Sequence, residues 1–220
     1  MAQHENILDG MLRRYRVKII FRRPLLGTVP LNEDAYAYTT KDTEADGIER
    51  VAFEAALETL EERLADDDDL GPQATGFLRL PDGKPCISNH MIKGFFKEAC
   101  WALRREPKTA TSKLAAYKKV INGTVFIEPR LLELHLPDGA EIGVLFRSLR
   151  GQTARGERVA IARSEMVPEG TWAEFVVVCF GRDVTEKHLR EWLSYGYLKG
   201  LGQWRSNEYG AFTYELEPMV

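Results

Sequence analysis

The chain has 220 residues, of which 44% are hydrophobic and 29% are charged, and its net charge at pH 7 is −3. This composition is typical of a globular protein with a sizeable core, and the negative total excludes a uniformly basic nucleic-acid binder. No apolar run approaches the roughly 18 residues of a membrane span. The first residues, MAQHENILDG, lack the apolar centre of a signal peptide. We therefore expect a cytoplasmic protein.

The first regular element is a strand over residues 12–21, LRRYRVKIIF. Tyr15, Val17, Ile19 and Phe21 fall on one face, and three basic residues fall on the other. This period of two predicts a half-buried strand with a basic outer face.

An amphipathic helix with an acidic outer face is predicted over residues 47–65, because its leucines recur at spacings of three and four. It runs into Asp66–Asp69. Adjacent carboxylates point in different directions and do not follow a calcium-loop pattern, so we interpret this run as a solvated turn and expect no metal.

A second helix is predicted over residues 88–105, with Ser88 or Asn89 as its N-cap and Trp101 in its apolar stripe. Gly94 is unusual in a helix, where it costs up to about 1 kcal/mol relative to alanine. We interpret it as a point where another backbone or a ligand approaches closely.

The remainder contains short strands around Pro129, a central strand in TWAEFVVVCF, and a third helix that begins at Asp183 in a capping-box-like pattern. Trp192 is predicted to lie in the core. The order of elements predicts an α+β fold, a ferredoxin-like (RRM-like) β-α-β sandwich with insertions. We expect a single domain over residues 1–220, with an inserted helical and loop region at about 71–123.

The three cysteines, Cys86, Cys100 and Cys179, are odd in number and form no C-x-x-C pair. Neither a zinc site nor a disulfide framework is indicated, and buried thiols in a reducing compartment are expected.

The C-terminal stretch YLKGLGQWRSNEYGAFTYE resembles the glycine-rich loop of the RAMP superfamily, the ferredoxin-like proteins of CRISPR systems. Three further segments are similar to the backbone-type RAMP proteins. They are RPLLGTVP, PCISNHMIKGFFKEACW and ERVAIARSEMVPEGTWAEFVV. The resemblance implies an RNA-recognition fold, RNA binding and assembly into a ribonucleoprotein complex. The matching positions are Gly27, Ser88, Lys93, Gly94, Arg158, Glu165, Pro168, Gly170, Gly200, Gly202, Arg205, Ser206, Tyr209, Gly210 and Phe212.

Single-stranded nucleic acid requires cations for phosphates and flat side chains for bases. Arginines cluster between residues 147 and 163, where Gly151, Gln152 and Gly156 suggest a flexible loop. We therefore predict non-catalytic binding of single-stranded nucleic acid, RNA in preference to DNA, without a cofactor. The predicted binding residues are Lys93, Gly94, Arg147, Arg150, Arg155, Arg158, Gly202, Trp204 and Arg205.

Two other functions are compatible with the sequence. A metal-independent ribonuclease would need a general acid and base, and His90 is the best-placed histidine for that role. A protein-interaction module, such as a viral inhibitor that imitates a subunit of a defence complex, could use the acidic helix and Asp66–Asp69 to copy nucleic-acid charge. Self-assembly or other ribonucleoprotein subunits are the expected protein partners.

Overall fold

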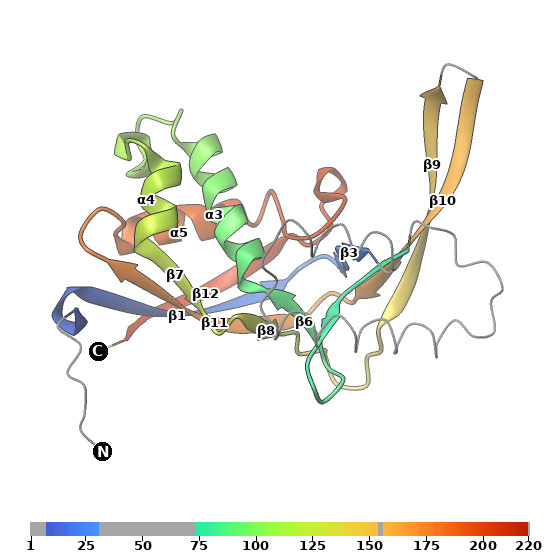
Figure 1. The fold of residues 1–220 in the computed structure, drawn as a ribbon, viewed down its shortest axis with the longest axis horizontal. Helices are drawn as coiled ribbons and strands as arrows, with labels where there is room; N and C mark the ends of the chain where they lie inside the picture. Colours follow the sequence, from blue (N-terminus) through green and yellow to red (C-terminus); the bar gives the residue numbers. More distant parts are fainter. Residues whose placement is uncertain (1–7, 31–73, 154–155, 220) are drawn as a thin grey trace.

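The computed structural model describes residues 8–30, 74–153 and 156–219 (Figure 1). The predicted acidic helix at 47–65, Asp66–Asp69 and Arg155 lie outside these residues. Among the described residues, no helix is long and apolar enough to cross a membrane. In the same ranges, no group of three or more His, Cys, Asp and Glu side chains could hold a metal ion.

The centre of the molecule is a four-stranded antiparallel sheet in the order β12-β1-β11-β7. Its strands are β1 (Leu12–Phe21), β7 (Val125–Glu128), β11 (Trp172–Phe180) and β12 (Phe212–Met219). Along the chain these strands follow one another as β1, β7, β11 and β12. The crossover from β1 to β7 therefore passes over β11 in the sheet, and the crossover from β11 to β12 passes over β1. The helices α3 (Asn89–Leu103), α4 (Tyr117–Thr124) and α5 (Glu186–Tyr195) cover one face (Figure 1). The predicted ferredoxin-like α+β fold is confirmed.

The core lies between this sheet and the helices. On β1, the predicted inner residues Tyr15, Val17, Ile19 and Phe21 are all buried, as the alternating pattern required. Trp192 on α5 is fully buried, as predicted, and packs against Phe96 of α3 with ring centroids 5.4 Å apart. Strands of period two and helices of period 3.6 therefore bury the faces that the sequence marked as apolar.

Two local expectations need correction. Trp101 is 49% exposed rather than buried, because it lies on the outer side of α3, where Arg105 contacts its ring. The N-cap of α5 is Thr185 rather than Asp183, and its capping partner is His188, three residues on. The buried His188 side chain supplies the acceptor that a glutamate gives in the usual capping box.

The predicted N-cap of α3 is confirmed, since Ser88 Oγ accepts a hydrogen bond from the His90 backbone N–H. The three cysteines are free and buried. Burial raises the pKa of Cys86 to about 12 and those of Cys100 and Cys179 to about 11. Their burial was expected from the sequence, and all three are neutral thiols near pH 7.

A second sheet has the order β2-β10-β4-β3, and β9 pairs with β10. Its strands are β2 (Leu25–Leu26), β3 (Val29–Pro30), β4 (Ala74–Gly76), β9 (Gly143–Thr153) and β10 (Gly156–Val167). A third sheet contains β5 (Leu78–Arg79), β6 (Pro85–Ser88) and β8 (Leu131–Glu133). Three short 3-10 helices are also described: η1 (Asp9–Met11), η2 (Thr111–Lys113) and η3 (Arg205–Asn207). The proposed insertion at about 71–123 stays a prediction; its described part contains α3.

Candidate nucleic-acid interface

The arginine-rich stretch is a long β-hairpin that projects from the body of the molecule (Figure 1). β9 and β10 pair from Gly143 opposite Met166 to Thr153 opposite Gly156. The prediction of a flexible loop is therefore wrong for the paired residues. The sequence did contain a signal for a hairpin. Two runs with alternating Val, Ile, Phe and Leu are separated by two residues followed by a glycine, a pattern typical of β-hairpins.

The pairing register divides the predicted arginines between the two hairpin faces. Arg147 lies opposite Ala162, whereas Arg150 lies opposite Val159. Because side chains alternate along a strand, residues 147 and 150 point to opposite faces. Arg158 pairs in register with Gly151, and Arg155 lies outside the described residues.

One face of the hairpin is apolar and exposed. Phe146, Val159 and Ile161 are 58%, 61% and 60% exposed, and we call these three residues the apolar hairpin face. The exposed Arg150 lies on the same face, and the Arg163 guanidinium is 5.5 Å from the centroid of the Phe146 ring. A flat ring and an exposed arginine on one surface are the groups that stack on bases and contact phosphates. Sequence reasoning missed this face.

The opposite hairpin face contacts the C-terminal glycine-rich loop. Arg147 Nη2 donates to Ser164 Oγ at 3.2 Å and to Gln203 Oε1 at 3.0 Å. Its guanidinium also lies 4.8 Å from the centroid of the Trp204 ring. The structure thus brings Arg147 against Trp204, another of the predicted binding residues, but Arg147 is engaged by the protein itself.

Trp204 is 39% exposed and already stacked. Its ring lies against Tyr209, with centroids 5.3 Å apart and an interplanar angle of 11°. With Tyr209 and Arg147 both against the indole, a base would have to displace one of them in order to stack there. Trp204 therefore joins the loop to the hairpin, and Phe146 is the more accessible aromatic ring.

The glycines of the loop bring protein backbones together. Gly202, at a φ of +77°, lies against β2: a Cβ there would stand 2.7 Å from Leu25 Cδ1 and 2.8 Å from Leu26 O. Gly200 and Gly210 approach so closely that a Cβ on either would overlap main-chain atoms, and Leu201 N donates to Gly210 O at 3.0 Å. The close approach inferred from the sequence is thus made by the chain itself.

The remaining predicted cations lie on different sides of α3. Arg205 pairs with Glu98, so the positive charge of Arg205 is compensated. Lys199 also approaches Glu98, to 3.5 Å. Lys93 faces α4 and β7: its Nζ donates to Asn122 O of α4 at 3.0 Å and lies 5.2 Å from the centroid of the Phe126 ring of β7. Burial and then the neighbouring Lys97 lower the Lys93 pKa. Lys93 lines a pocket of about 420 Å³ with His90, Phe126 and Arg130. The structure does not bring Lys93 to the hairpin.

Gly94 is exposed, and a Cβ at this position would have no atom within 4 Å. No described part of the protein therefore requires glycine there. The expected approach of another backbone is not made by the described residues, and the space beside the first turns of α3 is open.

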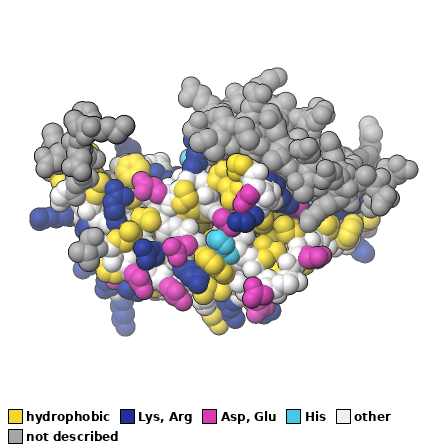
Figure 2. All heavy atoms as spheres, turned by 90° about the horizontal axis from the view of Figure 1, so that it is seen from below, with side chains coloured by type: hydrophobic (Ala, Val, Ile, Leu, Met, Phe, Trp, Pro, Cys, Tyr) yellow, Lys and Arg dark blue, Asp and Glu magenta, His cyan; other side chains and the backbone are white. Residues whose placement is uncertain are grey.

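The helix-free face of the central sheet carries both signs of charge. Figure 2, which views the molecule from below, shows basic and acidic side chains interspersed. Arg14 lies 3.4 Å from Glu128 and Arg16 lies 3.8 Å from Glu174, while Lys18 contacts the Trp172 ring. β12 adds exposed Glu215 and Glu217. This face is poorly suited to a polyanion because its cations are matched by carboxylates.

The fold and these contacts define a ferredoxin-like α+β protein with a projecting hairpin joined to a C-terminal glycine-rich loop. Neither a protein-family model nor a curated protein matches the chain. A solved structure that matches is a chain of the type III-B Cmr-beta complex bound to cognate target RNA, determined by cryo-EM. The identity is 11% and the TM-score is 0.57. The match covers 97% of this chain but 62% of that chain, so the present chain spans less than two thirds of its structural relative.

Proposed function

We propose that this chain binds single-stranded RNA without cleaving it, as a RAMP-type subunit of a CRISPR-like ribonucleoprotein. The observation that carries the proposal is the projecting hairpin, whose exposed face combines Phe146, Val159 and Ile161 with Arg150. The likeness in fold to a chain of an RNA-bound complex supports the choice of RNA.

The proposed binding mode places bases on the apolar hairpin face and phosphates beside Arg150. Stacking of a base on an aromatic side chain contributes about 1–3 kcal/mol and is tolerant of sequence. The hairpin can present these groups because its base is held by the second sheet, through β2 and β4 on β10. The predicted RNA contacts of Arg158 and Arg155 belong to the same proposal.

The proposal is tested by fluorescence anisotropy with a labelled single-stranded RNA at several salt concentrations. Arg150→Ala is expected to reduce the slope of log K against log salt by about 0.7, the value for one phosphate contact on a single strand. Phe146→Ala is expected to weaken binding by about 1–3 kcal/mol with an unchanged slope.

The matched control is Arg16→Ala, which removes an exposed arginine that is paired with Glu174 on the helix-free sheet face. It should leave the affinity unchanged. Equal losses in all three variants, or no binding at low salt, would contradict the proposal and favour a protein-interaction module. Tighter binding of DNA than of RNA would overturn the choice of ligand.

Absence of cleavage is part of the proposal. His90 is exposed beside Lys93 in the pocket at the start of α3, on the side of the helix that faces β7. The RNA is expected to remain intact on denaturing gels after prolonged incubation without metal. Cleavage that His90→Ala abolishes would replace this proposal with a metal-independent ribonuclease.

A further inference from the structure

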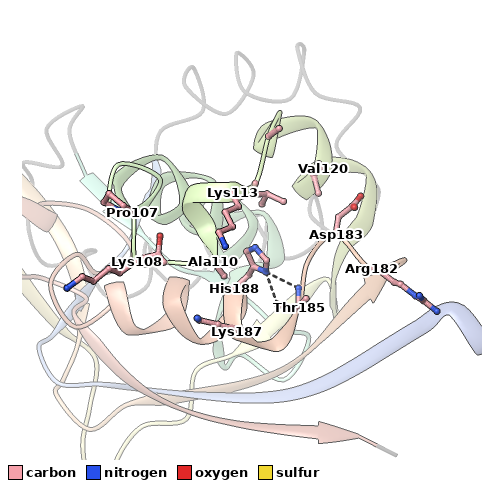
Figure 3. Close-up of a pocket in the computed structure, with 13 residues that line it drawn as sticks. Pro107, Lys108, Ala110, Lys113, Val120, Arg182, Asp183, Thr185, Lys187 and His188 are labelled. Atoms are coloured by element: carbon pink, nitrogen blue, oxygen red, sulfur yellow. Dashed lines mark hydrogen bonds between the residues drawn. The ribbon is translucent and has the colours of Figure 1, made fainter.

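A second basic site lies at the other end of the molecule from the hairpin. A pocket of about 710 Å³ opens between residues 107–115 and the start of α5 (Figure 3). In Figure 1, this end of the helical layer is remote from β9 and β10. None of the residues singled out for RNA binding lines the pocket.

The pocket has fixed walls. Glu191 of α5 accepts hydrogen bonds from Ala110 N at 2.7 Å and from Thr111 N at 3.0 Å. Trp192 Nε1 donates to Thr111 Oγ1 at 3.0 Å, so the loop is held on α5 at two points. On the other side, Thr185 N donates to His188 Nδ1 at 3.1 Å. The site is therefore largely formed before any ligand arrives.

The lining is strongly cationic. The basic lining residues are Lys108, Lys113, Arg182 and Lys187, and Asp183 is the single carboxylate among the lining residues. Within the described ranges, no residue forms an ion pair or hydrogen bond with any of these four basic side chains. In Figure 3 Lys113 points into the pocket toward His188, while Lys108 and Arg182 extend from its rim.

The remaining lining provides two other kinds of contact. Leu114, Ala115 and Val120 form an apolar wall, and Thr109 and Thr185 contribute hydroxyl groups. Pockets of about 300–1,000 Å³ that combine apolar walls with a few polar groups are typical of small-molecule sites. Cations and hydroxyls beside an apolar wall suit an anion that also carries a flat apolar part.

We propose that this pocket binds a nucleotide unit, with its phosphate beside Lys113 and Lys187 and its base against Leu114 and Val120. The site is separate from the hairpin, so it does not depend on the proposed RNA contact there. Lysine ammonium groups bind phosphates as point charges, and threonine hydroxyls add directional hydrogen bonds.

The test is isothermal titration calorimetry of the full chain with 5′-AMP, with adenosine and with hexa-aspartate as separate probes. We expect 5′-AMP to bind, and the Lys113→Ala/Lys187→Ala variant to lose affinity by about tenfold or more. The matched control, Lys118→Ala/Lys119→Ala, removes two exposed lysines of α4 that do not line the pocket and should leave binding unchanged. Arg150→Ala should also leave it unchanged, which separates this site from the hairpin.

A second measurement reports on the pocket itself. Burial lowers the pKa of His188; among the charged groups around the ring, Glu191 raises the pKa and Lys187 lowers it. Lys113 faces the ring from the neighbouring loop (Figure 3). A bound phosphate adds negative charge and should raise the His188 pKa in an NMR titration. Unchanged His188 titration, equal binding of adenosine and 5′-AMP, or preference for hexa-aspartate would each overturn the proposal.

Discussion

At the residue scale, the two glycines predicted to bind nucleic acid have different roles in the structure. Gly202 has a positive φ and lies against Leu25 and Leu26, so its lack of a side chain is needed for packing. Gly94 lies in α3 beside open space, where alanine would fit. The same residue type therefore marks an internal contact in one place and a free helix surface in the other.

These roles give a matched pair of substitutions. Gly202→Ala is expected to lower the free energy of unfolding by about 2–4 kcal/mol, because it combines a left-handed backbone with overlap on β2. Gly94→Ala is expected to raise it by up to about 1 kcal/mol, the usual gain from alanine in a helix. Urea denaturation measures both.

The outcome for Gly94 also bears on RNA. If Gly94→Ala is stable but weakens RNA binding, the open space beside α3 is part of the interface, as the sequence predicted. If Gly202→Ala proves as stable as the original chain, the contact between the glycine-rich loop and β2 does not hold the loop in place.

At the element scale, the hairpin is anchored by a buried ion pair. Glu165, near the base of β10, pairs with Arg79 of β5, and both side chains are almost completely buried. Glu165 Oε2 also accepts from Phe77 N at 2.9 Å. A buried charge that loses its partner is strongly unfavourable, so this pair fixes how the hairpin meets the rest of the fold.

Removing one partner should therefore be costly. Glu165→Gln and Arg79→Met are each expected to destabilise the protein by about 3–5 kcal/mol, and the double variant by less than their sum. Denaturant unfolding of the original chain, the two single variants and the double variant measures the coupling between the two side chains. As a comparison, Arg14→Ala breaks an exposed pair with Glu128 and should cost at most about 1 kcal/mol. Additive losses at Glu165 and Arg79 would show that the two side chains are not coupled.

At the scale of the whole molecule, the charge is unevenly distributed along the chain. Residues 31–73 contain 14 acidic and 3 basic side chains, a net charge of −11, which leaves +8 for the rest of a chain whose total is −3. The described residues on either side of this segment, β3 and β4, pair with each other in the sheet that carries the hairpin. The chain therefore enters and leaves this segment at the sheet that carries the hairpin.

The acidic segment should oppose RNA binding through its field. Changing Asp66–Asp69 to asparagine is expected to increase the association rate with single-stranded RNA, most strongly at low salt, because repulsion between like charges is reduced. Stopped-flow measurements at two salt concentrations test this. A slower association, or a gain that salt does not diminish, would contradict the electrostatic explanation.

Local patterns predicted most of the elements correctly. The strand at 12–21 and the helix from Ser88 follow from the spacing of apolar residues, which each segment carries in itself. The central position of β11 follows from its richness in valine and phenylalanine. Trp101 shows the limit of this reasoning, since a large aromatic residue at the edge of an apolar stripe was assigned to the core and is exposed.

The candidate site was less predictable than the fold. The sequence singled out Arg147 and Arg150 together, yet the pairing of β9 with β10 sends them to opposite faces. The pocket beside His188 could not be recognised in the sequence, because its lining comes from two segments about 70 residues apart. Such neighbours are set by packing between distant parts of the chain.

The amino-acid sequence by itself determined the ferredoxin-like arrangement, because burial of apolar faces with periods of two and 3.6 admits few ways to layer these strands and helices. Only the tertiary structure decided which cations remain available to a ligand. Arg147 and Arg205 are engaged by Gln203 and Glu98, whereas Lys113 and Lys187 line an open pocket. The physical reason is that electrostatic interactions depend on distances across space, which the order of residues along the chain does not specify.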